Sequence, residues 1–181
     1  MTKSFQLACA CGKVHLEVER TPIISTECHC NSCREAGARL DRLPVSHPIL
    51  EANGGTQFVL YRKDRIHFTQ GSELLSEFRL TPTSRTRRVV ATCCNTPVFL
   101  EFEGGHWLSL YAGLWPEGSL PPLEIRTMTG DRPHGAALDG DVPSGIRQTA
   151  RFYARLLGAW LAMGFKSPKI SVNGEINALC R

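Results

Sequence analysis

The sequence predicts a mainly β domain followed by one C-terminal helix. Between residues 13 and 129, short segments rich in β-branched and aromatic residues alternate with turns that contain glycine or proline, a pattern typical of many short strands. Apolar residues at sustained helical spacing occur only after residue 144. The 181 residues, 42% hydrophobic and 21% charged, suffice for one domain with a hydrophobic core and give no reason to expect disorder.

The first predicted strand, 13–19, alternates valine and leucine with polar residues, the period of a strand buried on one face. A short helical turn can follow the central cysteines at 34–38. Residues 39–56 contain two prolines and a Gly-Gly pair without a sustained period, which predicts a long loop over the sheet. The other predicted strands are 22–26, 57–61, 65–69, 74–80, 88–92, 98–102, 107–111 and 123–129.

The predicted helix begins after Ser144, a residue type suited to an N-cap, and ends near Gly164. Apolar residues on one face and arginines on another suggest an amphipathic helix that is docked on the sheet with its arginines in water. A dimer contact or an acidic partner is the alternative. The apolar positions are Ile146, Ala150, Tyr153, Leu157 and Trp160, and the arginine stripe is Arg147, Arg151 and Arg155.

Composition restricts the location and partners of the chain. No apolar run approaches the roughly 20 residues that span a bilayer, and the N-terminus lacks a secretory signal, so we expect a cytoplasmic protein without a membrane partner. The net charge of +4 is compatible with nucleic acid or a small acidic ligand but selects neither. We expect the densest basic stretch, Arg85, Arg87 and Arg88, to be a solvated strand face.

The eight cysteines carry the main functional signal, because clustered cysteines in a reducing compartment more often hold metal or do redox chemistry than form disulfides. Cys28, Cys30 and Cys33 place three sulfurs within six residues, a spacing that suits zinc. Three thiolates leave one corner of a tetrahedron open, as in a catalytic site. Alternatively a distant residue fills that corner and the site is structural; the candidates are Cys180, His47 and His106.

A second metal site is predicted from Cys9 and Cys11 in the run C-A-C-G. Two ligands cannot close a zinc site, and the natural complement is Cys93 and Cys94, which would tie the first strand to a later one. Adjacent cysteines chelate one ion less comfortably than C-x-x-C does, so Cys94 is the firmer ligand. A vicinal disulfide or one free thiol is the alternative for this pair.

The three runs C-A-C-G, C-H-C-N-S-C-R and A-T-C-C-N-T-P-V-F resemble the motifs of the glutathione-dependent formaldehyde-activating enzyme family. That family has an early C-x-C-G, a central C-H-C-x-x-C and a late C-x-x-C-G before an aromatic strand. The third motif departs from the pattern, because Asn95 stands at the family's glycine and Ala91 where its first late cysteine belongs. Asparagine tolerates the left-handed conformation that glycine serves. The resemblance covers about residues 5 to 115.

The resemblance implies a fold of packed, twisted antiparallel sheets of zinc-ribbon-related (β-tent) type. It implies two zinc ions, a structural one on the early and late cysteines and a catalytic one on Cys28, Cys30 and Cys33. The implied activity is that of a carbon–sulfur lyase acting on a glutathione adduct of a small aldehyde or related electrophile. We therefore expect a zinc-binding β domain at 1–130 and an extension at 131–181 whose helix packs on the same domain.

The chemistry of three thiolates fits this activity. They cancel the charge of zinc, so the ion acidifies water less than a three-histidine zinc does, and binding a fourth thiol as thiolate suits it better. Glutathione carries two carboxylates, for which Arg34 and Arg39 are candidate partners. His29, between two ligands, should point away from the metal if its neighbours point inward.

Two other functions are compatible with the sequence. One is a noncatalytic zinc module that binds protein or nucleic acid through the arginine stripe; the other uses Cys93 and Cys94 as a redox pair. Nucleic acid is not the expected partner, and a homodimer stays open.

Overall fold

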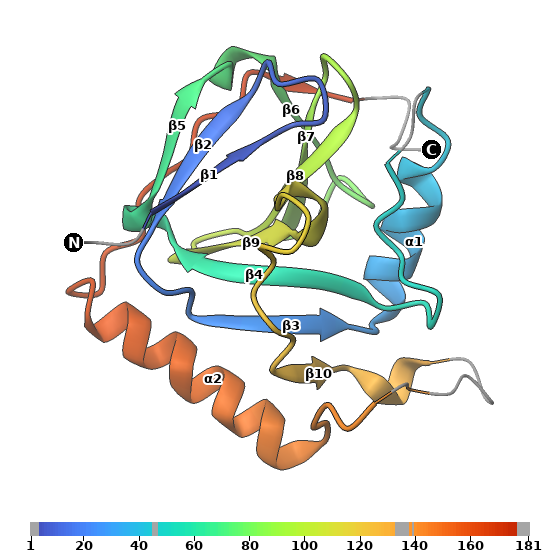
Figure 1. Ribbon diagram of the computed structural model, residues 1–181, viewed down its shortest axis with the longest axis vertical. Coiled ribbons are helices and arrows are strands. Elements are labelled where there is room, and N and C mark those ends of the chain that lie inside the picture. The colour runs from blue at the N-terminus through green and yellow to red at the C-terminus, as the bar shows by residue number, and fades with distance from the viewer. Residues whose placement is uncertain (1–3, 45–46, 133–137, 139, 177–181) are drawn as a thin grey trace.

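The computed structural model describes residues 4–44, 47–132, 138 and 140–176, which form two β-sheets and two α-helices (Figure 1). The helices are α1 (Asn31–Leu40) and α2 (Ile146–Leu161). The strands are β1 (Ser4–Ala8), β2 (His15–Glu19), β3 (Ile24–Cys28), β4 (Thr56–Arg62), β5 (Ile66–Gln70), β6 (Leu75–Phe78), β7 (Thr86–Ala91), β8 (Thr96–Phe102), β9 (Trp107–Tyr111), β10 (Ile125–Thr127) and β11 (Gly174–Glu175). Neither helix is long and apolar enough to cross a membrane.

The large sheet has the strand order β10-β3-β4-β9-β8-β7-β6-β11, and the small one β1-β2-β5. The outermost strands of the large sheet, β10 and β11, pair in parallel with β3 and β6, and the other pairs are antiparallel. The prediction of a mainly β fold with a C-terminal helix is confirmed.

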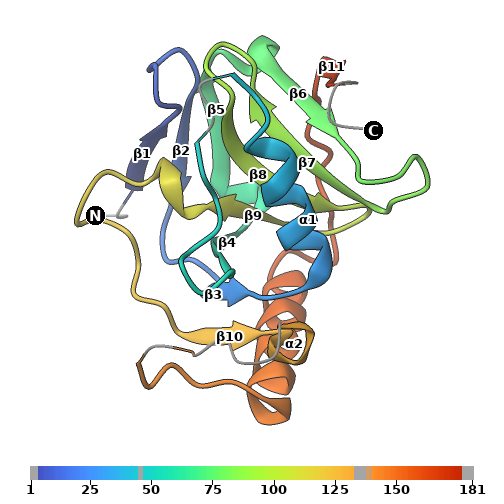
Figure 2. The ribbon, with the colours of Figure 1, turned by 90° about the vertical axis from the view of Figure 1, so that its right-hand side faces the viewer.

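The two faces of the large sheet are covered differently. On one face the small sheet packs through alternate residues such as Leu16 and Val18, and the main core lies between the two sheets. On the other face α1 packs on β6 and β7, and α2 packs near β3 and β10. In Figure 2, α1 lies in front of the large sheet and α2 lies below it.

The element boundaries correct several expectations. Helix α1 begins at Asn31, inside the central cysteine motif, and runs to Leu40, so the loop predicted over 39–56 is shorter. Strands β1 and β11 were not expected, and β3 begins at Ile24 and ends at Cys28, near which the strand end was expected. These short strands are defined by their pairing partners, which the local pattern does not contain.

Helix α2 docks by a different face from the one predicted. Its buried residue is Leu156, with Phe152 packed beside it, whereas Ile146 and Tyr153 are 90% and 64% exposed. The N-cap is Gly145 at φ 108° without a side-chain hydrogen bond, so Ser144 is not the cap. Apolar residues lie on more than one face of this helix, so spacing alone cannot select the face that the sheet buries.

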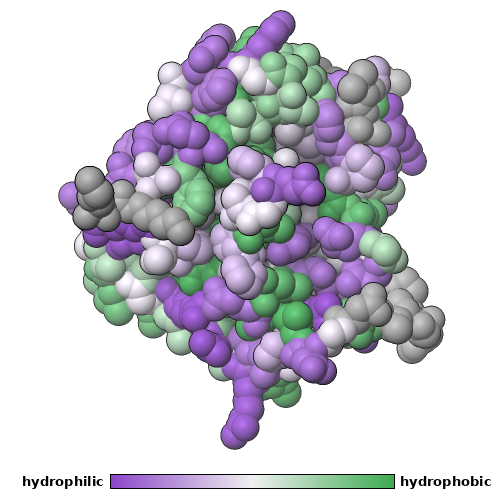
Figure 3. Space-filling view, in the orientation of Figure 1, coloured by the Kyte–Doolittle hydropathy of each residue, from purple (hydrophilic) through white to green (hydrophobic). Residues whose placement is uncertain are grey.

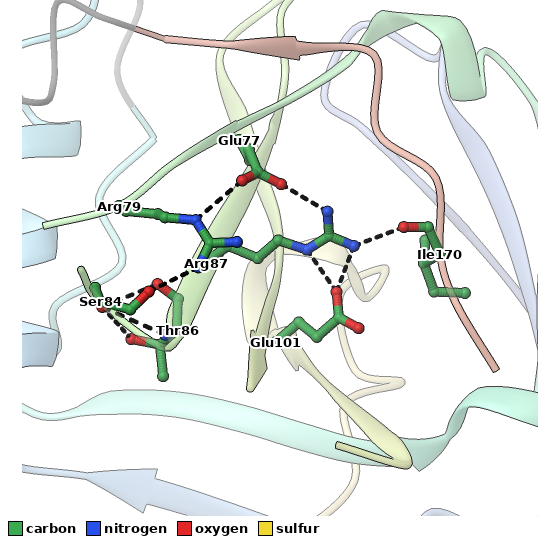
Figure 4. Close-up of polar contacts among 7 residues, drawn as sticks. All are labelled: Glu77, Arg79, Ser84, Thr86, Arg87, Glu101 and Ile170. Carbon is green, nitrogen blue, oxygen red and sulfur yellow. Dashed lines mark hydrogen bonds and ion pairs between the residues drawn. The ribbon is translucent and has the colours of Figure 1, made fainter. Parts of the chain in front are cut away.

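The basic stretch on β7 is not a solvated face. Arg85 is exposed, but Arg87 pairs with Glu77 and Glu101, and its Nη2 donates to the carbonyl of Ile170 at 2.6 Å (Figure 4). Arg88 points to the opposite face and is 1% exposed under α1. Both faces of β7 are covered, one by α1 and the other by the segment that contains Ile170, which the charge pattern does not reveal.

Candidate metal centres

Two turns, separated by more than 80 residues, bring Cys9, Cys11, Cys93 and Cys94 together as the four-cysteine cluster. The first turn joins β1 to β2 and the second joins β7 to β8. The Sγ atoms of Cys11 and Cys93 are 3.4 Å apart, Cys9 lies 3.6 Å from Cys11 and 3.8 Å from Cys93, and Cys93 lies 3.9 Å from Cys94. Zinc–sulfur bonds of about 2.3 Å in a tetrahedron place sulfurs about 3.8 Å apart. The cluster therefore has the dimensions of a closed zinc site.

The turns around this cluster are built to present sulfur. The backbone N–H of Val14 donates to the Cys9 Sγ at 3.3 Å, and the N–H of Ala10 donates to the Thr96 hydroxyl at 3.0 Å, which ties the two turns together. Asn95 adopts φ 59°, the left-handed conformation expected for a residue at the family's glycine. Burial disfavours the Cys94 thiolate, but hydrogen bonds from Thr96 and the backbone lower the pKa of Cys94 to about 6.

The central cluster consists of Cys28, Cys30 and Cys33, whose sulfurs lie within 4.8 Å of one another. Cys28 is the last residue of β3, Cys30 is the N-cap of α1 and Cys33 is in its first turn. The Cys30 Sγ accepts the Cys33 N–H at 3.3 Å, as an N-cap side chain does. Hydrogen bonds from the Cys28 and Cys33 thiols hold the pKa of Cys30 well below its usual range, whereas hydrogen bonds to Cys28 and Cys30, with burial, raise the pKa of Cys33.

In the part of the chain that the structure describes, only these three cysteines belong to the central cluster. The proposed fourth ligands are elsewhere: His106 Nε2 contacts the Leu156 carbonyl at 2.8 Å, and His47 Nε2 lies 3.2 Å from the Cys94 carbonyl. Cys180 lies outside the described residues. The described residues thus leave one position of a tetrahedron open.

His29 points away from the cluster, as expected, into a buried polar network that the sequence did not suggest. The Glu27 Oε1 lies 2.6 Å from the His29 Nε2, and it accepts hydrogen bonds from Arg126 Nε at 3.0 Å and Asn53 Nδ2 at 3.1 Å. Glu27, His29 and Arg126 are all buried, so the network fixes the end of β3 against β10 and the loop before β4. The sequence signal that could have indicated this network is the pair Glu27 and His29 on either side of Cys28.

The two arginines predicted to bind substrate occupy opposite ends of α1. Arg34 lies beside the central cluster, where its guanidinium donates to the carbonyls of His29 and Asp131, both at 2.7 Å. Arg39 lies about 9 Å further along the helix axis than Cys33. It donates to Glu35 at 2.8 Å and to the Leu80 carbonyl at 3.2 Å.

Arg88 and Tyr111 lie beside the central cluster and were not identified from the sequence. The Arg88 Nη2 donates to the Ser32 carbonyl at 3.0 Å and hydroxyl at 3.3 Å, between the two ligands of α1. Burial raises the pKa of Tyr111; the Arg88 charge lowers that pKa and Cys33 raises it, which places Tyr111 near both groups. The available sequence signal was weak: Arg88 follows Arg87 and precedes the apolar pair Val89 and Val90.

A cavity of about 300 Å³ is lined by Ala10 and Thr96 from the turns of the four-cysteine cluster and by Tyr111. The lining comes from the first cysteine turn, the loop before β4 and the strands β4, β8 and β9, and it includes His47, Ile49, Gln57 and Pro97. Tyr111 connects this cavity to the surroundings of the central cluster, but none of the three central cysteines lines it.

The fold and the clusters define a mainly β protein with two groups of cysteines that could hold metal ions. Residues 1–112 match the model of a family of unknown function, DUF6151, and the chain belongs to that family. The match includes both clusters and ends before α2. A crystal structure of a Rhodobacter sphaeroides protein is similar at 17% sequence identity and a TM-score of 0.46, covering 65% of this chain and 92% of that chain. No curated protein matches.

Proposed function

We propose that this protein is a zinc-dependent enzyme with carbon–sulfur lyase-type chemistry, acting on a glutathione adduct of a small aldehyde or related electrophile. The observation that carries the proposal is the central cluster, three converging thiols without a fourth ligand among the residues described. The motif resemblance to glutathione-dependent formaldehyde-activating enzymes, and with it the β-tent type of fold, belongs to the same proposal.

The residues present fit zinc at both clusters. Cys9, Cys11, Cys93 and Cys94 would hold a structural ion, and Cys28, Cys30 and Cys33 a catalytic one, to which the substrate sulfur would add as fourth ligand. Bound zinc would supply a charge that favours the thiolate form of the substrate beside its electrophile.

The chain's own residues would orient the substrate and exclude water. Phe58, Leu100 and Tyr111 pack against the cysteines and form an apolar wall. Arg34 is the nearest candidate partner for a glutathione carboxylate, but its guanidinium also holds two backbone carbonyls. Arg39, at the other end of α1, would meet only a distant part of the substrate.

The test combines metal content, binding and turnover. We expect two zinc ions per chain, glutathione binding by calorimetry, and exchange between glutathione and its formaldehyde adduct by NMR. Cys30→Ser should abolish binding and exchange while the four-cysteine cluster keeps its zinc. Protein with two zinc ions that neither binds glutathione nor exchanges the adduct would overturn the proposal.

The alternative is a noncatalytic zinc module. Arg147 and Arg151 are exposed on α2 and could contact an acidic partner, whereas Arg155 pairs with Glu124 at 2.5 Å. Salt-sensitive DNA binding that is lost when Arg147 and Arg151 are replaced by alanine would favour this module over the enzyme.

A further inference from the structure

Arg88 is a buried cation without a carboxylate partner among the described residues. Its side chain is 1% exposed, and only Nη2 is bonded, to Ser32; Nε and Nη1 have no hydrogen-bond partner. A buried charge of this kind destabilises the fold unless an opposite charge lies close to it. Because Arg88 is buried in this way, we expect a compensating anion near its guanidinium.

The central cluster is the group that can supply the anion. Ser32, which accepts a hydrogen bond from Arg88, lies between Cys30 and Cys33 in the sequence. Arg88 lowers the pKa of Tyr111 and Cys33 raises it, so both groups lie close to the Tyr111 phenol. Three thiolates exceed the charge of a divalent ion by one, and a fourth thiolate raises the excess to two. The four-cysteine cluster has a different environment, with hydrogen bonds from Val14 N–H and contacts to Thr96.

We propose that Arg88 is the positioning residue that compensates the negative charge of a metal–thiolate centre at Cys28, Cys30 and Cys33. The inference rests on the proposed function, and it specifies the substrate class: a guanidinium at this place favours an anionic sulfur as fourth ligand over a neutral imidazole or amine. The unpaired Tyr111 hydroxyl, buried nearby, adds a hydrogen-bond donor on the same side.

The test is a zinc titration of the full chain against a chromogenic chelator, with Arg88→Met as a variant of similar length without charge. We expect zinc affinity at the central cluster to fall about tenfold or more, as for other outer-shell residues, with the four-cysteine cluster unchanged as internal control. Arg88→Lys, which keeps the charge, should retain most of the affinity, and Arg88→Gln replaces Arg88→Met if that variant does not fold.

The outcomes separate the two proposals. If both clusters of Arg88→Met, or of Arg88→Gln where the first variant is insoluble, bind zinc as tightly as the original chain, the role of Arg88 is overturned and the proposed function stands. If the original chain binds a single zinc, at the four-cysteine cluster, the proposed function itself fails. The ratio of glutathione affinity to imidazole affinity should also be lower for the Arg88→Met protein than for the original chain.

A second inference comes from the solvent side of α2. Large apolar side chains there are exposed: Ile146 by 90%, Tyr153 by 64%, Leu157 by 53% and Leu161 by 52%. Ala150, Ala154 and Gly158 lie one turn apart beside them, which would let another helix approach closely. This face is distinct from the one that Phe152 and Leu156 dock on the sheet.

The apolar surface continues beyond the helix. Trp160 stacks on His106 with ring centroids 5.7 Å apart and contacts Phe165 at 5.1 Å, while Trp107 contacts both His106 and Phe102. In Figure 3, green surface is visible at the lower left, where α2 passes. Several large apolar side chains exposed on one helix are typical of an interaction surface.

We infer that a second copy of this chain packs on α2 in antiparallel orientation. Helix α2 contains Arg147, Arg151 and Arg155 but no acidic residue, and its last turn has no basic residue. Antiparallel pairing would bring Arg147 and Arg151 toward the carbonyl end of the partner helix, where positive charge is favourable, while Arg155 stays paired with Glu124 of its own chain. A two-fold axis then places the same apolar face on both sides of the interface.

Light scattering coupled to size exclusion tests this inference on the full chain. We expect a dimer at micromolar concentration. Leu157→Glu should shift the protein toward monomer and raise the dissociation constant at least tenfold. Thr83→Glu, which adds the same charge at an exposed turn, should cause no shift. A monomer at 100 micromolar, or a dimer that Leu157→Glu does not weaken, would overturn it. So would a monomer that sediments with anionic vesicles.

Discussion

The two cysteine clusters differ in how the chain assembles them. The four-cysteine cluster joins two turns that lie more than 80 residues apart and contains four sulfurs, so a metal there would act as a cross-link between the sheets. The central cluster comes from one short run at the end of β3 and start of α1 and contains three sulfurs. Closure by distant ligands favours stability, and local chelation leaves a position for another molecule.

Their surroundings differ in the same sense. Near the four-cysteine cluster the contacts come mainly from backbone groups and Thr96. Next to the central cluster lie the buried charged residues Glu27, Arg126 and Arg88. Burying charge is costly, so its concentration beside one cluster is the clearest difference between the environments of the two sites.

The largest effect should follow from breaking the cross-link. Cys11→Ser removes one of four ligands, so we expect loss of that zinc and a melting temperature lower by about 10 °C, since structural metal binding contributes directly to the free energy of unfolding. Thermal denaturation with elemental analysis measures both. An unchanged melting temperature would show that the four-cysteine cluster is not a structural metal site.

Cys30→Ser should give the complementary result. Serine preserves the N-cap of α1, so the helix start survives while the central ligand set is lost. We expect loss of the central zinc and of glutathione binding, with a melting temperature that falls much less than in Cys11→Ser. A drop as large as that of Cys11→Ser would remove the distinction between the clusters.

A smaller effect is expected from Gly55→Ala, which disturbs the polar network beside the central cluster. An added Cβ would lie 2.6 Å from Glu27 Cγ and 2.9 Å from His29 Cε1, so these side chains must shift, at a cost of about 1–3 kcal/mol. Zinc affinity should weaken at the central cluster only. Gly113→Ala is the matched control because nothing lies within 4 Å of its added Cβ.

The smallest effect concerns α2, whose Leu156 packs in the same core cluster as Cys33. Burial, with the charges of Lys63 and Arg62, holds the pKa of His106 below its usual 6.5. The unfolded chain therefore takes up this proton first, and the stability from neutral His106 is complete above about pH 6.5 and declines as the pH falls through the folded pKa. The melting temperature of His106→Gln should fall less than that of the original chain between pH 7.5 and 5.5. Equal falls would contradict this prediction.

The sequence predicted what depends on local chemistry. Three sulfurs in six residues converge because one strand end and one helix start fix them, and the outward direction of His29 follows from its place between two ligands. Most strands of the large sheet were also predicted, because each carries its own β-prone run and turn signals.

The remaining features depend on contacts between distant segments. The burial of Arg88 follows from α1 lying over an interior strand, and the docked face of α2 follows from which residues meet the sheet. The Glu27 network needs Arg126 and Asn53, which are far away in the sequence. Charge patterns and helical periods describe one segment at a time and contain no such information.

The sequence distance between the two halves of the four-cysteine cluster also bears on biosynthesis. All three central thiols are present once residue 33 has left the ribosome, and α1 can present them locally. The other cluster requires Cys94 and the β7–β8 turn, and its halves must close a loop of more than 80 residues before they meet. A chain that acquires zinc during synthesis would therefore load the central cluster first and the cross-link last.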